Sequence, residues 1–212
     1  EAAWMAGAAI GLAAIAIWDD VSESERTGLG PALVFGHDLV SSCITAILGS
    51  DGSYREGVLY GAWMLRMVIP YFEAYRRFSG IDLGADPRIE KVAAWLCYEV
   101  LPEGDGRTNN LNDSLWLTRP LAVHSTYLDW VQYRFGSPLA KYLEQHVTGV
   151  YGHDAGADGD KVATVLWNRD IAAANPGSLL PAGSLFADRG IYYYRNAWKN
   201  AASGSEILFT FQ

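Results

Sequence analysis

The spacing of apolar residues divides the chain into a long helical part and a short part with the pattern of strands. Apolar residues recur at helical spacing in four consecutive segments: 2–17, 23–48, 55–78 and 88–101. The first segment is apolar on nearly all sides, which is typical of a helix packed on several faces. Asp86 and Pro87 predict the start of the fourth segment, because aspartate caps a helix and proline suits its first turn. We expect these helices to stack as hairpins.

The second half of the chain changes from helical spacing to alternation. Helical spacing continues over 114–150, with breaks at Pro120 and at 136–138, and a short helix is expected over 161–170. Three strands follow from alternating apolar residues: 184–187, 191–195 and 206–211. Because so small a meander leaves strand edges unpaired, we expect further strands beyond this sequence.

A polar, glycine-rich segment over 51–61 precedes the third helix and is the first candidate site. Its Asp-Gly pair favours a turn, and Ser53 is a candidate cap for the helix that follows. We expect Glu56 in the first helical turn, where a carboxylate suits the positive end of the helix dipole. Glu56 and Tyr60 would then lie four residues apart on one helical face. Either they address the same substrate, or Tyr60 is a core tyrosine and Glu56 a solvated charge.

Composition and charge exclude several classes of protein. Half of the 212 residues are hydrophobic, which excludes a disordered chain, and the formal net charge of −8 argues against nucleic-acid binding. An anionic substrate is still compatible with this charge if a few arginines gather locally. Segment 2–17 is short of a membrane span and lacks the basic flank of a signal peptide, so we expect a buried helix and no membrane insertion. Cys43 and Cys97 lie in apolar helical contexts and are expected in the core.

A second polar segment, over 102–114, follows the fourth helix. Loops on a helical scaffold often carry binding groups, and Arg107, Asn109 and Asn110 suit sugar hydroxyls or a carboxylate. The alternative is a solvated loop that caps the next helix through the Asn-Asp pair at 112–113. Both interpretations are compatible with the sequence.

The histidines and the acidic loop over 151–160 are weaker candidates. His37 and His124 lie in helical patterns, where a hydrogen-bonded core histidine is the favoured interpretation. The aspartates of the acidic loop could hold a cation, but a solvated loop is favoured, since His153 adds no known metal-ligand spacing. We therefore expect no metal site within the chain.

The segment DGSYREGVLYG at 51–61 resembles the Asp-Gly-x-x-x-Glu-Gly-x-x-Tyr signature of the heparinase II/III-like polysaccharide lyases, which include the alginate and oligoalginate lyases. The apolar helix before it (WMAGAAIGLAAIAI), the later Gly104 and Asp105, and the strand pair ADRGIYYYRNAW and EILFTF resemble that family in the same order. The resemblance covers essentially the whole chain, and the Glu-Gly-x-x-Tyr element is moderately specific.

This resemblance implies a fold and a reaction. The fold would be part of an incomplete (α/α) toroid over 1–175, followed by the first antiparallel strands of a β-sandwich domain over 176–212, with the sugar cleft between them. The reaction would be β-elimination at a uronic acid residue: the carboxylate is neutralised, a base takes the C5 proton, and an acid protonates the leaving glycosidic oxygen. The partner would be an acidic polysaccharide or oligosaccharide.

The resemblance also implies roles for single residues. Tyr60 matches the tyrosine that serves as the acid and, for some substrate geometries, also as the base. A phenol is protonated at neutral pH, so only the base role needs a nearby positive charge or hydrogen-bond donors. Arg55 would support the loop, and Arg66 and Arg107 would offset the acidity of the chain. The expected substrate-binding residues are Glu56, Asp105, Arg107, Asn109 and Asn110.

Two elements of the family pattern are missing from this sequence. Near the start of the first helix the family has an Asn or His that helps to neutralise the carboxylate, whereas this chain has Trp4 and Met5. The family's His-rich segment, with a second catalytic histidine and metal ligands, would begin after Gln212. We therefore expect a fragment of a periplasmic or secreted enzyme that is inactive alone. No cofactor is expected within this chain, and any divalent metal, such as zinc, would belong to the missing part.

Two alternatives stay open at this point. A glycoside hydrolase on an α/α scaffold would use carboxylates such as Glu56 and Asp105, and its products would lack the new double bond. A non-catalytic carbohydrate-binding protein of the same fold would bind sugar without forming a product.

Overall fold

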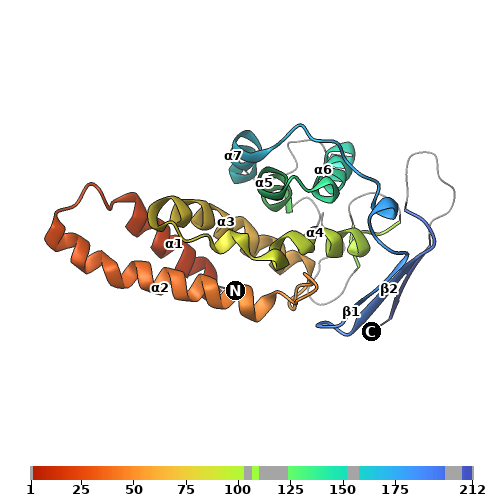
Figure 1. Cartoon of the computed structure of the whole chain (residues 1–212), viewed down its shortest axis with the longest axis horizontal. Coiled ribbons are helices and arrows are strands. Elements are labelled where there is room, and N and C mark those ends of the chain that lie inside the picture. Colours follow the sequence, from red (N-terminus) through yellow and green to blue (C-terminus); the bar gives the residue numbers. More distant parts are fainter. Residues whose placement is uncertain (1, 103–106, 110–123, 152–157, 199–206, 212) are drawn as a thin grey trace.

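The computed structural model describes residues 2–102, 107–109, 124–151, 158–198 and 207–211. It is mainly helical, with a small antiparallel sheet near the C-terminus (Figure 1). The α-helices are α1 (Ala2–Ala16), α2 (Glu23–Ile47), α3 (Val58–Ser79), α4 (Pro87–Glu99), α5 (Ser125–Phe135), α6 (Pro138–Tyr151) and α7 (Asp158–Trp167). The strands are β1 (Gly183–Phe186), β2 (Ile191–Arg195) and β3 (Leu208–Phe211). The expected class, helices followed by antiparallel strands, is confirmed.

Both consecutive and alternate helices of the chain are neighbours in space. α1 and α2 form a hairpin, and α3 contacts both α1 and α5. α5 in turn contacts α6 and α7, and α4 contacts α5 and α6. Figure 1 shows the α1–α2 hairpin at one end of the molecule, α5, α6 and α7 on one side of α4, and the sheet beyond the end of α4. α3 is therefore the helix that joins the N-terminal hairpin to the rest.

Close contact between α1 and α2 depends on glycine. A Cβ at Gly36 of α2 would lie 2.8 Å from the carbonyl oxygen of Gly7 and 3.0 Å from the Cα of Gly11, both in α1. Real side chains do not approach a backbone so closely, so only glycine lets the two helices meet here. α2 also continues through Pro31, although the sequence predicts a weakened beginning there.

Helix α2 has the length and composition of a helix that could cross a membrane, and 28% of its most apolar window is buried. The same pattern occurs in core helices of soluble proteins and in signal sequences near an N-terminus. The absence of membrane insertion stays a prediction.

The core lies where α3, α4 and α5 meet, and it contains large aromatic side chains that bind polar partners. The Tyr127 hydroxyl donates to the carbonyl oxygen of Ile89 at 2.8 Å. The Trp130 indole donates to the Glu73 carboxylate at 3.0 Å, and both side chains are buried. These bonds matter because a buried polar group without a partner costs free energy.

The sheet is an antiparallel meander in the order β1-β2-β3. Phe186 pairs with Ile191 between β1 and β2, and Tyr193 pairs with Thr210 between β2 and β3. Ile191, Tyr193 and Arg195 are buried on one face of β2. The segment that leads into the sheet is tied to α4, because the Tyr98 hydroxyl donates to the carbonyl oxygen of Pro181 at 2.5 Å. The sheet therefore docks on the C-terminal end of α4.

Replacing Gly61 with alanine tests how tightly the start of α3 is packed. A Cβ at Gly61 would lie 2.7 Å from Cγ of the fully buried Tyr54, so the ring would have to move. We expect Gly61→Ala to lower the free energy of unfolding by about 1–3 kcal/mol in urea denaturation.

Gly28→Ala is the matched control, because Gly28 also lies within a helix and a Cβ there would have no neighbouring atom within 4 Å. Alanine there should be neutral or stabilising by up to roughly 1 kcal/mol. Equal effects of the two substitutions would contradict the packing described for α3.

Candidate functional site

The segment before α3 is a tight loop closed by a short antiparallel contact. Leu48 pairs with Tyr54, and the Arg55 N–H donates to the carbonyl oxygen of Ile47 at 3.1 Å. Inside the loop the Ser53 N–H and hydroxyl both donate to the Asp51 carboxylate, at 3.0 and 2.6 Å. The expected turn is present, and the Ser53 hydroxyl is bound to Asp51 inside the turn.

The beginning of α3 differs from the sequence prediction. The helix starts at Val58, with Gly57 as its N-cap at φ 88°, a conformation that glycine adopts easily and other residues rarely do. Ser53 therefore does not cap α3, and Glu56 lies outside its first turn, so the prediction that Glu56 and Tyr60 share one helical face is wrong. Glu56 is half-buried, and its Oε2 has no hydrogen-bond partner among the described residues.

Tyr60 lies in the first turn of α3 and is partly exposed. Its ring meets the edge of the Trp63 ring at a centroid distance of 5.8 Å. Tyr60 is the first of six partly or fully exposed residues that follow one another along α3 at spacings of three and four: Tyr60, Trp63, Met67, Pro70, Ala74 and Arg77. This spacing places them in one stripe, which runs roughly 26 Å along the helix axis at 1.5 Å per residue.

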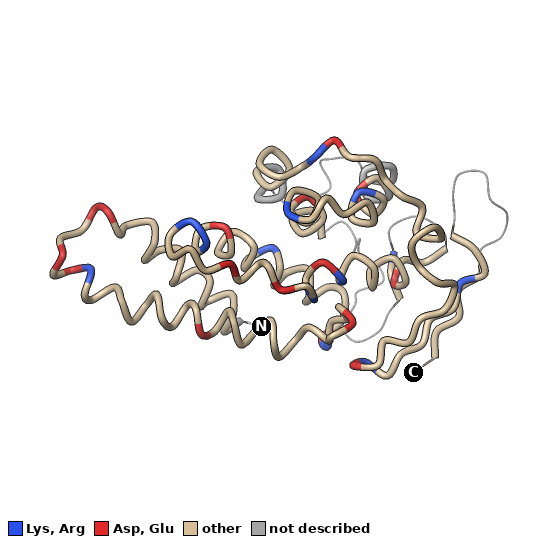
Figure 2. Tube along the Cα trace, in the orientation of Figure 1, with Lys and Arg blue, Asp and Glu red and all other residues tan. Residues whose placement is uncertain are grey.

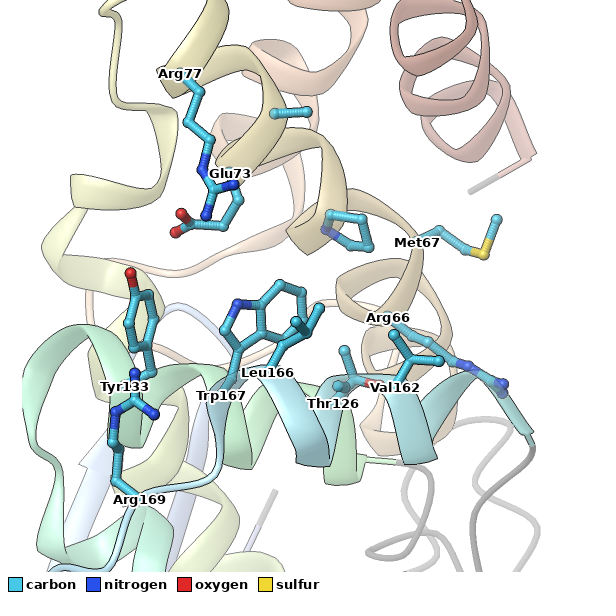
Figure 3. Close-up of a pocket in the computed structure, with 13 residues that line it drawn as sticks. Arg66, Met67, Glu73, Arg77, Thr126, Tyr133, Val162, Leu166, Trp167 and Arg169 are labelled. Atoms are coloured by element: carbon cyan, nitrogen blue, oxygen red, sulfur yellow. The ribbon is translucent and has the colours of Figure 1, made fainter. Parts of the chain in front are cut away.

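The C-terminal half of the stripe forms one wall of a pocket of about 630 Å³, shown in Figure 3. α3 faces α5 and α7 across this pocket, and the aromatic side chains Tyr133 and Trp167 line the opposite wall. The lining between them is mainly apolar, including Pro70 and Leu166. A concave, mostly apolar site of this size with a few polar groups is typical of small-molecule binding.

Arginines supply the polar groups of the pocket. Arg66 and Arg77 come from α3, and Arg169 follows α7. The Arg169 guanidinium lies 4.7 Å from the centroid of the Tyr133 ring, a cation–π contact that keeps both side chains in place. In Figure 2, basic positions occur both on the α3 segment and on the α5–α7 group. The pocket is therefore positive within an acidic chain.

One carboxylate also lines the pocket, but it is already bound. The Glu73 side chain accepts from Trp130 at 3.0 Å and from Arg76 at 2.8 Å, and the Arg134 guanidinium lies 3.6 Å away. Glu73 is 5% exposed. Its charge is therefore balanced by protein groups.

The wall formed by α7 is anchored to α5 through a buried aspartate. The Thr164 hydroxyl and the Asn168 amide donate to the two carboxylate oxygens of Asp129, at 2.8 and 2.7 Å. Burial raises the pKa of Asp129, and these two hydrogen bonds act in the opposite direction. This anchor fixes Trp167 and Arg169, which flank Asn168, relative to α5.

A second polar cluster lies at the junction of α4 and the sheet. Glu99 is 1% exposed and accepts a hydrogen bond from the Tyr193 hydroxyl. Burial raises the pKa of Glu99 to about 7, although Tyr193, Arg189 and Asn109 act in the opposite direction by stabilising the carboxylate. Beside it the Arg195 guanidinium donates to the carbonyl oxygens of Tyr98 and Val100. The cluster ties the sheet to the helices.

Two of the predicted substrate-binding residues lie near this junction. The Asn109 N–H donates to the carbonyl oxygen of Glu99 at 2.8 Å, and the Leu101 N–H donates to that of Arg107, also at 2.8 Å. Arg107 and Asn109 therefore flank an isolated antiparallel bridge between Val100 and Thr108 after the end of α4, and neither residue lines the pocket. Asp105 and Asn110 lie outside the described residues, as does most of the acidic loop over 151–160.

His124 is buried and its Nε2 lies 3.0 Å from the carbonyl oxygen of Val58, the first residue of α3. Burial lowers the pKa of His124 to about 4, so the ring is neutral at physiological pH and donates from Nε2. The interpretation of His124 as a core histidine is consistent with this position. It fixes the end of α3 that carries Tyr60.

The pocket was only partly foreseen from the sequence. Arg66 was expected to offset the acidity of the chain, and it does line the pocket. Arg77, Tyr133, Trp167 and Arg169 were missed. The helical spacing of Arg66, Pro70 and Arg77 was a usable signal for the α3 wall, whereas nothing local marks the residues of the opposite wall.

Comparison with models of known protein families, with curated proteins and with solved structures finds no match for this chain. Among the described residues, no group of three or more His, Cys, Asp or Glu side chains is placed to hold a metal ion. The site must therefore be interpreted from its own geometry.

Replacing Glu99 with glutamine tests the buried carboxyl at the junction. The folded protein keeps the Glu99 proton up to about pH 7, whereas the unfolded chain releases it near the ordinary value of 4.5. This contribution to stability is complete below pH 4.5 and is lost as the pH rises to about 7. The loss is roughly 3 kcal/mol, and Glu99→Gln should abolish it.

The measurement is the free energy of unfolding in urea from about pH 4.5 to pH 8, for the wild type and the variant. Their difference should change across this range and become level above about pH 7, because all other groups are shared. A difference that is independent of pH would show that Glu99 titrates normally.

Proposed function

We propose that the chain is part of a polysaccharide lyase that cleaves a uronic-acid polymer by β-elimination, with Tyr60 as the residue that protonates the leaving oxygen. The observation that carries this proposal is the stripe on α3. A partly exposed tyrosine stands at its N-terminal end, and a pocket lined by arginines and aromatic rings borders its C-terminal half. An acidic saccharide needs both a proton donor at the reacting bond and positive charge along its length.

The packing of the helices supports the proposed architecture. In an (α/α) toroid, alternate helices form an inner layer around the cleft and the others form an outer layer. Here α1, α3, α5 and α7 contact one another in that order, α4 contacts α6, and the pocket lies among α3, α5 and α7. The meander β1-β2-β3 follows the helices, as the first strands of a β-sandwich domain would.

The proposed step assigns one proton transfer to this chain. A base removes the proton at C5 of the uronate, the C4–C5 double bond forms, and the C4–O bond breaks. The departing glycosidic oxygen then takes the proton of the Tyr60 hydroxyl. The T-shaped contact between the Tyr60 and Trp63 rings limits the positions that the Tyr60 hydroxyl can take for this transfer.

Hydrolysis is less well supported by the same geometry. A glycoside hydrolase needs two carboxyl groups that face the sugar. Among the described residues that line the pocket, the only carboxylate is Glu73, which Trp130 and Arg76 already bind. Glu56 lies before α3 and does not line the pocket.

Tyr60→Phe tests the proposed role directly, because it removes the hydroxyl and keeps the ring. The protein that contains these 212 residues is expressed in full and given uronic-acid polymers, and the ultraviolet absorbance of the unsaturated uronate product is followed. We expect kcat to fall about 10²–10⁴-fold in the variant, the usual contribution of a general acid.

Tyr194→Phe is the matched control, because Tyr194 is an exposed tyrosine of β2 and should leave turnover unchanged. Unchanged turnover in Tyr60→Phe would remove Tyr60 from the mechanism. Products with new reducing ends but no ultraviolet absorbance would identify a hydrolase, and sugar binding without any product would identify a binding protein.

A further inference from the structure

One end of the pocket gathers groups that suit a single anion. Figure 3 shows Arg169 and Tyr133 on one wall of this end and Arg77 on the other, with the Tyr133 hydroxyl directed toward α3. Among the described residues, neither the exposed Arg77 guanidinium nor the Tyr133 hydroxyl has a hydrogen-bond partner. Arg169 donates one N–H to the carbonyl oxygen of Asn168 at 3.3 Å, and a guanidinium has further N–H groups to offer. Two guanidinium groups and a phenol can therefore bind one carboxylate here.

The carboxylate of Glu73 lies at the same end of the pocket but does not cancel this positive charge. Its oxygens accept from Trp130 and Arg76, and the Arg134 guanidinium lies 3.6 Å away. The charges of Arg77 and Arg169 are therefore additional to those that balance Glu73.

The rest of the pocket is apolar and open to water. Met67 on the α3 wall is 43% exposed, and on the α7 wall Val162 is 59% and Leu166 is 55% exposed. Large apolar side chains that are exposed on both walls of one groove mark a surface that a ligand can cover. From Met67 to Arg77 the α3 wall runs roughly 15 Å at 1.5 Å per residue, so an extended chain could lie along it.

The two parts of the pocket together select the chemistry of a ligand. A small inorganic anion would use the cationic end and leave both apolar walls in water. A neutral hydrocarbon would cover the walls and leave Arg77 and Arg169 without a partner. A molecule with one anionic group and an extended apolar chain uses both parts.

We infer that the pocket also binds a free long-chain carboxylate. Its carboxylate lies among Arg77, Arg169 and Tyr133, and its alkyl chain runs between Met67 and Leu166. The inference goes beyond the proposed function, because it concerns a second class of ligand. Since both ligands would use the same arginines, the long-chain carboxylate would compete with an acidic saccharide.

Calorimetry on the 212-residue chain tests this inference without any saccharide. Octanoate, decanoate and dodecanoate are titrated below the concentrations at which they form micelles, and 1-decanol serves as the uncharged analogue. We expect affinity to rise about tenfold for each two-carbon step, because each buried methylene adds a similar increment. At low salt decanoate should bind about tenfold more tightly than 1-decanol, and added salt should narrow this difference.

Single substitutions separate the cationic end from the apolar walls. Arg77→Gln should weaken decanoate binding about tenfold and leave 1-decanol binding unchanged. Leu166→Asn should weaken the binding of both ligands, because it removes part of the apolar wall. Arg26→Gln is the matched control: it removes the same charge from α2, where Arg26 binds the carbonyl oxygen of Trp18, and should leave both affinities unchanged. Thermal melting confirms that every variant is folded.

Three results would overturn the inference. They are an affinity that does not depend on chain length, equal binding of decanoate and 1-decanol, and equal effects of Arg77→Gln and Arg26→Gln. Each is measured in the absence of saccharide and of turnover, so a failure here is distinct from a failure of the lyase reaction, which Tyr60→Phe tests.

Discussion

Burial of one face of α3 is the constraint on which the rest of the structure depends. Its apolar side supplies fully buried core residues such as Val68, Ile69 and Phe72, and it contacts both α1 and α5. The position of that side determines where the opposite side points. Because Tyr60, Pro70 and Arg77 share the exposed stripe, the packing of the core also places the candidate proton donor and one wall of the pocket.

The start of α3 is held from three directions. The loop before it contacts α4, where the Lys91 ammonium donates to the carbonyl oxygen of Ser50 at 2.9 Å, and it contacts the β1–β2 turn, where the Ser50 hydroxyl donates to Asp188 at 2.7 Å. His124 binds Val58 from the side of α5. A Cβ at Gly52 would meet the Lys91 backbone at 2.5 Å, so the loop can approach α4 only with glycine there. The sheet and the helices therefore fix Tyr60 together, although they are far apart in the sequence.

The spacing of apolar residues was enough to predict the helices and strands, but it did not predict all of their ends or the tertiary contacts between them. Strand β2 has the predicted bounds of 191–195, and Asp86 caps α4 as expected, because both signals are local. The start of α3 was predicted three residues too early. The helical spacing of the sequence continues through Gly57, but the positive φ of Gly57 is incompatible with a helix, so α3 begins only at Val58. The pocket wall opposite α3 could not be predicted from the sequence either, because Tyr133 and Arg169 meet only through the packing of α5 and α7. Glu99 had no visible role in the sequence, because its partner Tyr193 lies 94 positions away.

The central proposal is that the exposed stripe of α3 and the wall of α7 together form the binding surface for an acidic saccharide. Amide hydrogen exchange on the full chain, with and without a saturating uronic acid oligomer, tests it most directly because it reports where the ligand lies. The account predicts slower exchange in 60–77 and 162–169, and unchanged exchange in 183–195 and 207–211. Protection confined to the sheet, or protection of neither helix, would contradict it.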